Sequence, residues 1–307
     1  MRVVFFGTPH WALPALDELV AAGVEVAAVV TKADRPSGRG LKGVDRPVAE
    51  RARELGLLLY QPEGGTKEQT QRWLQALTVQ AAVVVAYGSI LPKELIEIPP
   101  LGFVNLHFSL LPRYRGAAPV ARALMDGSDH TGVSTMVLTE GMDEGPVLAR
   151  KRVPIDPDDT AGSLGARLAG LGAELLVSSL LAYERGDLVP EPQDHSSATY
   201  APKITEAEAR VSWGDSSRSV RDLIRGLNPS PGAWTTLRAG RVKLHRAERA
   251  RGAPALAPGE LAAHEELWVG TGDGALVLTE VQSAGRKRMS GADLARGLRL
   301  QPGERFD

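Results

Sequence analysis

The chain has 307 residues, of which 43% are hydrophobic and 24% are charged, and its net charge is −1. This is the composition of a soluble globular protein with one large or two ordinary domains. The absence of cysteine excludes disulfides, thiolate metal sites and a cysteine nucleophile. Because we find no signal peptide and no apolar run approaching membrane-spanning length, we expect a cytoplasmic protein.

Strands and helices alternate over the first 100 residues. Apolar runs predict strands at 3–6, 25–30, 57–60 and 81–86. Helices are predicted between them at 11–22, 47–55 and 67–77. Continuous apolar strands separated by helices indicate a parallel sheet that is covered on both faces. We therefore predict an α/β fold with a doubly wound, mostly parallel, Rossmann-like sheet.

The next predicted strand, at 104–108, carries two polar residues, Asn105 and His107. Side chains two residues apart on a strand point to the same side, so this pair shares one face. The strand ends in a loop rich in proline, arginine and glycine, where α/β enzymes often present catalytic groups. An edge strand with two solvated polar residues is the alternative interpretation.

A carboxylate follows the alternating strand predicted at 132–138. Asp143 lies in a loop bracketed by Gly141 and Gly145. A carboxylate beside an imidazole stabilises the imidazolium form and fixes its tautomer, and a nearby Asn amide can donate to an oxyanion. Asn, His and Asp without a cysteine suit acyl transfer to an external nucleophile. Taken alone, Asp143 is also typical of a turn.

The second half of the chain changes character after a long predicted helix at 160–184. Residues 187–205 are rich in proline and lack an apolar period, which is the composition of a linker. Short runs at 233–237, 241–245, 267–270 and 275–281 predict strands of a small β-barrel or sandwich. We predict a catalytic domain at 1–189, a linker at 190–205 and a C-terminal OB-like β-barrel domain at 206–307.

Several motifs together resemble the folate-dependent formyltransferases. The motifs are Asn105-Leu-His107, Ser109-Leu-Leu-Pro-Arg-Tyr-Arg-Gly116, Asp143-Glu-Gly-Pro146, Phe6-Gly-Thr-Pro9, Ala86-Tyr-Gly-Ser-Ile-Leu-Pro92 and Tyr200-Ala-Pro-Lys-Ile204. The resemblance covers nearly the whole chain and is greatest to the members that act on methionyl-tRNA. It implies formyl transfer from 10-formyltetrahydrofolate to the α-amine of methionine on initiator tRNA, for translation initiation. The implied catalytic residues are Asn105, His107 and Asp143.

The resemblance also implies where the folate donor binds. The loop after the strand at 81–86 and the segment before Asp143 would form its pocket, together with the loop after His107. The expected contact residues are Ile90, Leu91, Ser109, Leu110, Leu111, Pro112, Glu140, Gly141 and Met142. Read without the family, Ile90 and Leu91 are simply the first turn of a helix that packs inward.

The stretch 33–46 is basic and long for a connection between a strand and a helix. In the family it matches an insertion that meets the acceptor end of tRNA, so Arg35, Arg39 and Lys42 are the expected tRNA contacts. A solvated connection is the alternative. For Arg113 and Arg115, contacts to a folate carboxylate or a phosphate and surface ion pairs are equally plausible.

The remaining sequence features argue against other cofactors and define the alternative functions. The first strand–helix junction lacks the Gly-x-Gly-x-x-Gly pattern of dinucleotide sites, and no His, Asp or Glu cluster has metal-ligand spacing, so we expect no nicotinamide, flavin or metal. We expect a monomer with no membrane partner. The rival activities are formyl transfer to glycinamide ribonucleotide or to amino sugars. A non-catalytic RNA-binding protein is a further rival, in which Asn105, His107 and Asp143 would be dispensable.

Overall fold

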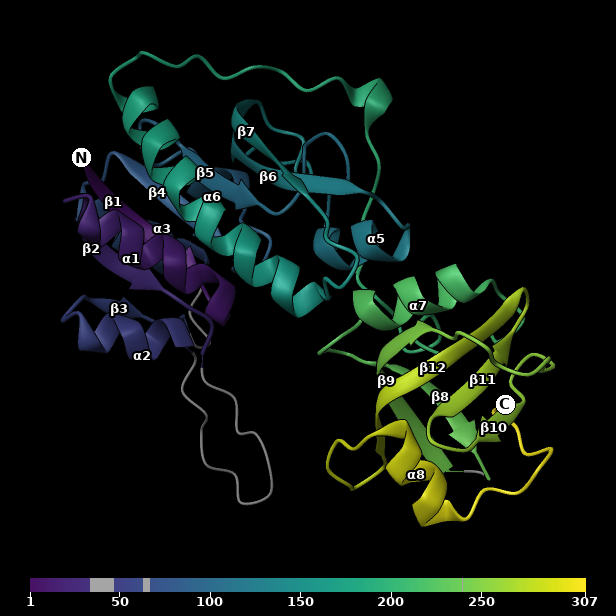
Figure 1. Cartoon of the computed structure of the whole chain (residues 1–307). Helices are drawn as coiled ribbons and strands as arrows, with labels where there is room; N and C mark the ends of the chain where they lie inside the picture. Colours follow the sequence, from purple (N-terminus) through teal and green to yellow (C-terminus); the bar gives the residue numbers. More distant parts are fainter. Residues whose placement is uncertain (34–46, 63–66, 239) are drawn as a thin grey trace. The chain divides into compact units, whose positions relative to one another are not determined.

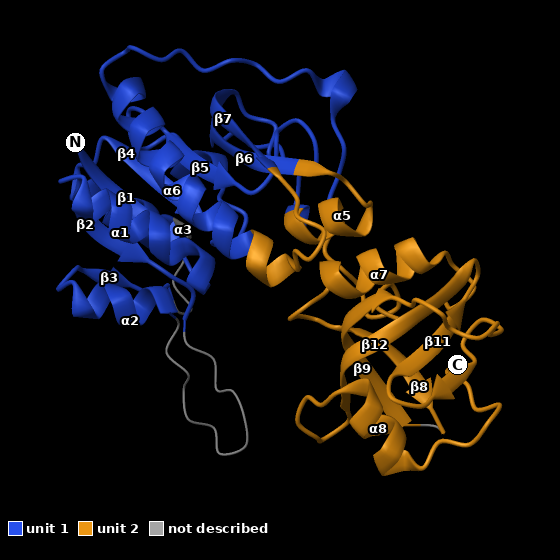
Figure 2. Ribbon diagram, in the orientation of Figure 1, with its two compact units in different colours: residues 1–119, 131–153, 165–202 blue, residues 120–130, 154–164, 203–307 orange. Residues whose placement is uncertain are grey.

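The structure is a computed structural model that describes residues 1–33, 47–62, 67–238 and 240–307. The chain forms two compact units (Figure 2). Unit 1 comprises residues 1–119, 131–153 and 165–202, and unit 2 comprises residues 120–130, 154–164 and 203–307.

Unit 1 is built on a seven-stranded sheet in the order β3-β2-β1-β4-β5-β6-β7 (Figure 1). The strands are β1 (Arg2–Gly7), β2 (Glu25–Val30), β3 (Leu59–Tyr60), β4 (Ala81–Val85), β5 (Phe103–His107), β6 (His130–Val137) and β7 (Val147–Pro154). Strands β1 to β5 pair in parallel, whereas β6 runs antiparallel to β5. The predicted α/β class with a mostly parallel sheet is confirmed.

Helices cover both faces of this sheet. They are η1 (His10–Ala12), α1 (Leu13–Ala21), α2 (Pro47–Glu54), α3 (Lys67–Leu77), α4 (Lys93–Ile96) and α6 (Ala161–Glu184). On one face, Leu74 of α3 and Ile96 of α4 share an apolar cluster with Phe103 of β5. On the opposite face, Leu106 of β5 lies against Gly172 of α6, where a larger side chain would not fit.

Helix α6 is 24 residues long and apolar enough to cross a membrane by length and composition. The expectation that no apolar stretch reaches that length was therefore wrong. The packing of Gly172 on Leu106 and of Gly165 on Trp11 accounts for its apolar character, because the helix covers a buried sheet face.

Unit 2 contains a five-stranded antiparallel sheet in the order β10-β11-β12-β9-β8. Its strands are β8 (Ala233–Leu237), β9 (Gly240–Arg249), β10 (Leu261–Ala263), β11 (Leu267–Thr271) and β12 (Gly274–Ser283). Its helices are α5 (Pro119–Met125), which lies in this unit from Val120 onward, α7 (Ser217–Gly226) and α8 (Gly291–Leu298). The short 3-10 helix η2 (His195–Ser197) belongs to unit 1. The side chains of Val220 and Ile224 on α7 join the core of the sheet. The predicted small C-terminal β domain is confirmed as this antiparallel sheet.

The predicted domain boundaries differ from the two compact units. Residues 190–202, expected to be a linker, belong to unit 1, and residues 120–130 and 154–164 belong to unit 2. Backbone hydrogen bonds explain the first difference, because Glu191 exchanges two of them with Val147 of β7. Side-chain periodicity does not reveal such main-chain pairing. As independently folding domains, 1–189 and 206–307 stay predictions.

Candidate active site

The two polar residues of β5 lie on one buried face. The exposed fractions of Asn105 and His107 are 8% and 6%. Phe103, two residues earlier on the same face, belongs to the apolar cluster under α3 and α4. This face therefore changes from apolar to polar toward the carboxyl end of the strand, where parallel α/β sheets bind ligands.

The His107 ring is held by a hydrogen bond at one nitrogen, and its other nitrogen faces a carboxylate. Its Nε2 lies 2.9 Å from the carbonyl oxygen of Tyr114, and since a carbonyl only accepts, Nε2 carries the hydrogen. Its Nδ1 faces Asp143 Oδ2 at 3.6 Å. A proton on Nδ1 would turn this facing pair into an ion pair. Because Nε2 is already engaged, Nδ1 is the atom that can serve a reacting group.

Asp143 is held in an unusual backbone conformation with φ of 51°. Its Oδ2 accepts a hydrogen bond of 2.8 Å from the backbone N–H of Gly116. A side chain at Gly116 would lie 2.9 Å from the carbonyl oxygen of Ala201, and the φ of 119° also favours glycine. Glycine at position 116 thus lets the loop lie against the backbone at Ala201 while its N–H donates to Asp143.

A second set of polar contacts, formed by Arg115 and Gln193, holds the backbone of Asp143. The sequence patterns did not predict it. Arg115 is 1% exposed and donates to Gln193 Oε1 from both Nε and Nη2, at 3.1 and 2.8 Å. Gln193 Nε2 in turn donates to the carbonyl oxygens of Asp143 and Gly145, at 2.8 and 2.7 Å. Burial and these partners mean that Arg115 is neither a surface ion pair nor an exposed anion-binding group.

The loop that follows β5, residues 109–116, which we call the signature loop, packs largely inward. The Ser109 hydroxyl donates to the carbonyl of Arg113, and the Leu111 side chain is buried with Met136 and Val147. Leu110 lies against Gly132 of β6, and Pro112 accepts a backbone hydrogen bond from Thr199. The four residues expected to touch folate here thus make internal contacts.

The other expected folate residues are spread around the loop that carries Asp143. Ile90 is 90% exposed, whereas Leu91 packs against the apolar cluster containing Phe103. Gly141 adjoins the side chain of Glu144, and Met142 is 59% exposed and close to Gly116.

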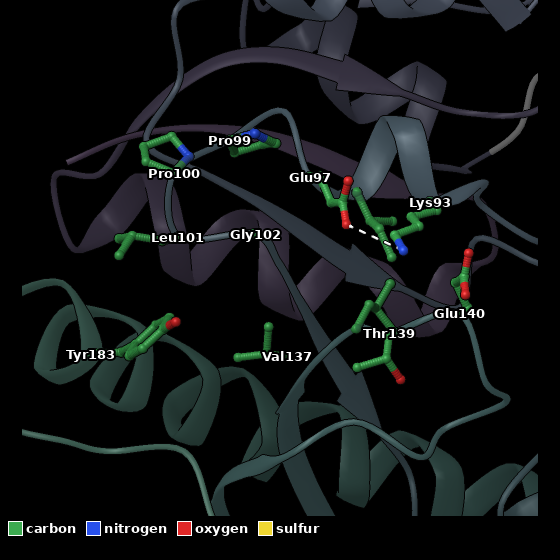
Figure 3. A pocket seen from close by; sticks show the side chains of 12 residues that line it. Lys93, Glu97, Pro99, Pro100, Leu101, Gly102, Val137, Thr139, Glu140 and Tyr183 are labelled. Carbon is green, nitrogen blue, oxygen red and sulfur yellow. Dashed lines mark ion pairs between the residues drawn. The ribbon is translucent and has the colours of Figure 1, made fainter.

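Glu140 lines a cavity of about 540 Å³ in unit 1 (Figure 3). The cavity is lined by Lys93, Ile96, Glu97, Pro99, Pro100, Leu101, Gly102, Val137, Leu138, Thr139, Glu140 and Tyr183. Its volume falls within the range of small-molecule sites. Leu138 hydrogen-bonds Phe103 at the start of β5, and Asp143 faces His107 at the end of that strand. The loop from Thr139 to Asp143 therefore connects the cavity to the catalytic candidates.

The expected tRNA contacts Arg35, Arg39 and Lys42 lie outside the described residues. In the ranges that the structure describes, no group of three His, Asp or Glu side chains is arranged to hold a metal ion.

The fold and the Asn-His-Asp site define a class of protein, and the family models identify it. The model described as "Formyl transferase" matches residues 1–180, and the one described as "Formyl transferase, C-terminal domain" matches residues 203–299. A methionyl-tRNA formyltransferase of Solibacter usitatus is 44% identical to this chain over 306 residues, which cover 100% of this chain and 98% of that protein. This chain is 47% identical to that of Streptomyces coelicolor, over 99% of both chains. The chain therefore belongs to the methionyl-tRNA formyltransferase family.

Solved structures share the fold at low sequence identity. A methionyl-tRNA formyltransferase from Clostridium thermocellum is 18% identical with a TM-score of 0.60, over 82% of this chain and 95% of its own. HypX from Aquifex aeolicus in complex with tetrahydrofolic acid is 20% identical with a TM-score of 0.69, over 96% of this chain and 47% of its own.

Proposed function

We propose that this protein transfers the formyl group of 10-formyltetrahydrofolate to the α-amine of methionyl initiator tRNA, with Asn105, His107 and Asp143 at the reacting centre. The arrangement of His107 carries the proposal: its ring is fixed between the Tyr114 carbonyl and the Asp143 carboxylate at the end of β5. Membership of the family supplies the reaction. The tRNA substrate belongs to translation, which supports a cytoplasmic location.

The reaction needs an oxyanion to be stabilised and one proton to be moved. The amine nitrogen attacks the formyl carbon, and the bond between that carbon and N10 of the donor then breaks. Asn105 and the Nδ1–H of His107 stabilise the oxyanion by donating hydrogen bonds to it. Asp143 orients His107 and assists the transfer of a proton from the attacking amine to the leaving nitrogen.

For the folate donor, we propose the cavity beside Glu140. Its apolar lining by Ile96 and Leu138, with polar groups at its rim, suits an aromatic ring that carries hydrogen-bonding groups. The contacts expected at Ile90, Leu91, Met142 and the signature loop stay predictions. Replacing Thr139, which lines the cavity, by Trp fills part of it, and we expect binding of a folate analogue to weaken about tenfold.

Calorimetric titration of the analogue measures that change. Ser178→Trp, at an exposed position of α6, is the matched control and should bind the analogue like the unmodified protein. Equal affinities in both variants would place the donor elsewhere.

For the RNA substrate, we propose that Arg35, Arg39 and Lys42 contact phosphates or end bases of the tRNA. The basic composition of this segment supports the proposal. Replacing Arg39 and Lys42 by Ala should weaken tRNA use and flatten its dependence on salt, because fewer counterions are released. Binding of the folate analogue should not change. Unchanged tRNA kinetics and an unchanged salt slope would contradict the proposal.

Formyl incorporation tests the whole assignment. Methionyl initiator tRNA should be formylated when 10-formyltetrahydrofolate is present and not when it is omitted. Glycinamide ribonucleotide and an amino-sugar nucleotide serve as competing acceptors. A preference for either of these would overturn the proposed acceptor while leaving the site chemistry intact.

A further inference from the structure

The carboxylate of Asp143 works only if its loop keeps a backbone shape that the residue itself disfavours. A φ of 51° lies in the left-handed region, which residues with a side chain adopt rarely and keep only when surrounding contacts hold it. The 3.6 Å separation from His107 Nδ1 also leaves little room for displacement, since a further shift would weaken the ion pair. Contacts that hold this loop therefore bear on catalysis.

Gln193 supplies such contacts from a distant part of the sequence. Its amide nitrogen donates one hydrogen bond to the carbonyl of Asp143 and another to the carbonyl of Gly145. Its exposed fraction is 5%, so water does not compete for these partners. Both hydrogens of one amide thus hold the chain on either side of Glu144.

Arg115 fixes which way round the Gln193 amide lies. A guanidinium has only donors, so the Gln193 oxygen must face Arg115 and the nitrogen must face the two carbonyls. The remaining nitrogen of Arg115, Nη1, lies 3.7 Å from Glu144 Oε1 and 3.4 Å from His195 Nδ1.

The contacts close into a ring. Gly116, covalently joined to Arg115, donates to the Asp143 carboxylate, while Arg115 holds the Asp143 backbone through Gln193. One dipeptide of the signature loop thus fixes both the side chain and the main chain of Asp143. No metal or solvent contact is needed to complete this ring.

We propose that Gln193, oriented by Arg115, is a positioning residue that holds Asp143 in its contact with His107. This inference rests on the proposed roles of Asp143 and His107. A purely structural role, in which Gln193 only ties residues 190–202 to unit 1, is the alternative. The two differ in whether the donors of Gln193 affect the chemistry of a folded protein.

Gln193→Glu separates the two roles, because it keeps the oxygen that Arg115 binds but loses both donors to the loop. Because a carboxylate oxygen would then face the carbonyl oxygens of Asp143 and Gly145, we expect a lower thermal midpoint, and kcat is compared at a temperature at which both proteins are folded. We expect kcat for tRNA formylation to fall between about 10-fold and 100-fold, since a misplacement of about 1 Å can cost about 10²-fold. The KM values for tRNA and folate should change little.

The pH profile of kcat supplies a readout that does not depend on the fraction of folded protein. With Asp143 displaced, His107 no longer faces this carboxylate, so the pH dependence of kcat should change in Gln193→Ala, which adds no charge, as well as in Gln193→Glu. Among the described residues, the titratable side chains that contact Arg115 in this set are Glu144 and His195. Gln75→Glu, on the exposed side of α3, is the control for the added charge and should match the unmodified protein.

A normal kcat and pH profile in Gln193→Glu would overturn the positioning role. Asp143→Asn distinguishes that failure from failure of the catalytic assignment. If Asp143→Asn is impaired while Gln193→Glu is not, the error lies in the role of Gln193. If Asp143→Asn keeps full activity, the proposed site itself is wrong.

Discussion

Each unit of the molecule buries a histidine in a strand, and the two imidazoles have different surroundings. His107 of β5 has a carbonyl at Nε2 and the Asp143 carboxylate facing Nδ1. His245 of β9 is 2% exposed, its Nε2 lies 3.1 Å from Gln282 Oε1, and its Nδ1 has no hydrogen-bond partner among the residues that the structure describes.

The difference shows what makes a buried imidazole useful. Burial lowers the pKa of His245, because removing water disfavours the charged ring, and Arg288 and Lys243 add to the lowering. The hydrogen bond to Gln282 and the charge of Glu280 oppose it. A buried strand histidine without a carboxylate at its second nitrogen thus stays neutral, whereas the Asp143 carboxylate offers His107 a partner for its charged form.

The largest expected effect comes from removing the candidate catalytic residues around His107 in unit 1. Asn105→Ala, His107→Ala and Asp143→Ala should each lower turnover by about 10²–10³-fold or more, the size of losing one oxyanion donor. Binding of charged tRNA should change little, because these groups act at the reacting centre. Single-turnover formylation together with tRNA binding measures both quantities.

The control for this series is His264→Ala, an exposed histidine of unit 2. It should keep normal turnover. Near-normal turnover in all three site variants, with the proteins folded, would show that the assigned residues do not perform the reaction.

A smaller change, Asp143→Asn, makes the surroundings of His107 resemble those of His245. Asp143→Asn removes the charge but keeps an oxygen that can accept from Gly116. His107 then lacks an anionic partner, and we expect turnover to fall, but less than in Asp143→Ala. Measurement of kcat for the two variants under the same conditions tests this. Normal turnover in Asp143→Asn would mean that the charge of Asp143 does not contribute to the reaction.

The catalytic candidates could be predicted from the sequence because local patterns, strand alternation and loop glycines, mark their positions. The alternation of β5 places Asn105 and His107 on one face, and the glycines around Asp143 mark a loop. The contact of Asp143 with His107 agrees with that prediction, while the catalytic roles stay predictions.

The contacts that hold the backbone of Asp143 could not be predicted from the sequence, because they join residues that are far apart along the chain. Arg115 and Gln193 are 78 residues apart, and neither stands in a pattern that suggests the other. The proline-rich residues around Gln193 resemble a linker because main-chain hydrogen bonds, rather than apolar side chains, hold them in place. Strand β7 was likewise missed, since its polar residues from Arg150 to Arg152 obscure the apolar alternation.

We expect the buried His245 to make the stability of unit 2 depend on pH. In the unfolded chain a histidine titrates near pH 6.5, whereas the pKa of folded His245 is lowered by burial. The unfolded state therefore binds a proton more readily, and the stability of unit 2 should fall as pH drops below about 6.5, until the folded ring also titrates. His245→Gln keeps a donor for Gln282 and removes this titration. Urea unfolding at pH 7.5 and pH 5.5 should show a smaller loss in His245→Gln than in the unmodified protein, and equal losses would exclude His245 as a source of the pH dependence.

The smallest expected effect concerns an ion pair of unit 2 whose carboxylate, Glu208, is exposed to water. The hydrogen bond from Arg122, at 2.7 Å, and those from Thr205 lower the pKa of Glu208 to about 2. The pair's stabilisation is present above the ordinary carboxyl value of 4.5 and is lost as pH falls toward about 2. Because Glu208 is exposed, we expect no more than about 1 kcal/mol for the pair. A double-mutant cycle of Arg122→Met and Glu208→Gln, followed by urea unfolding at pH 6 and pH 3.5, measures the coupling. A coupling of several kcal/mol that did not decrease at the lower pH would mean that exposure does not separate this pair from the buried contacts around Asp143.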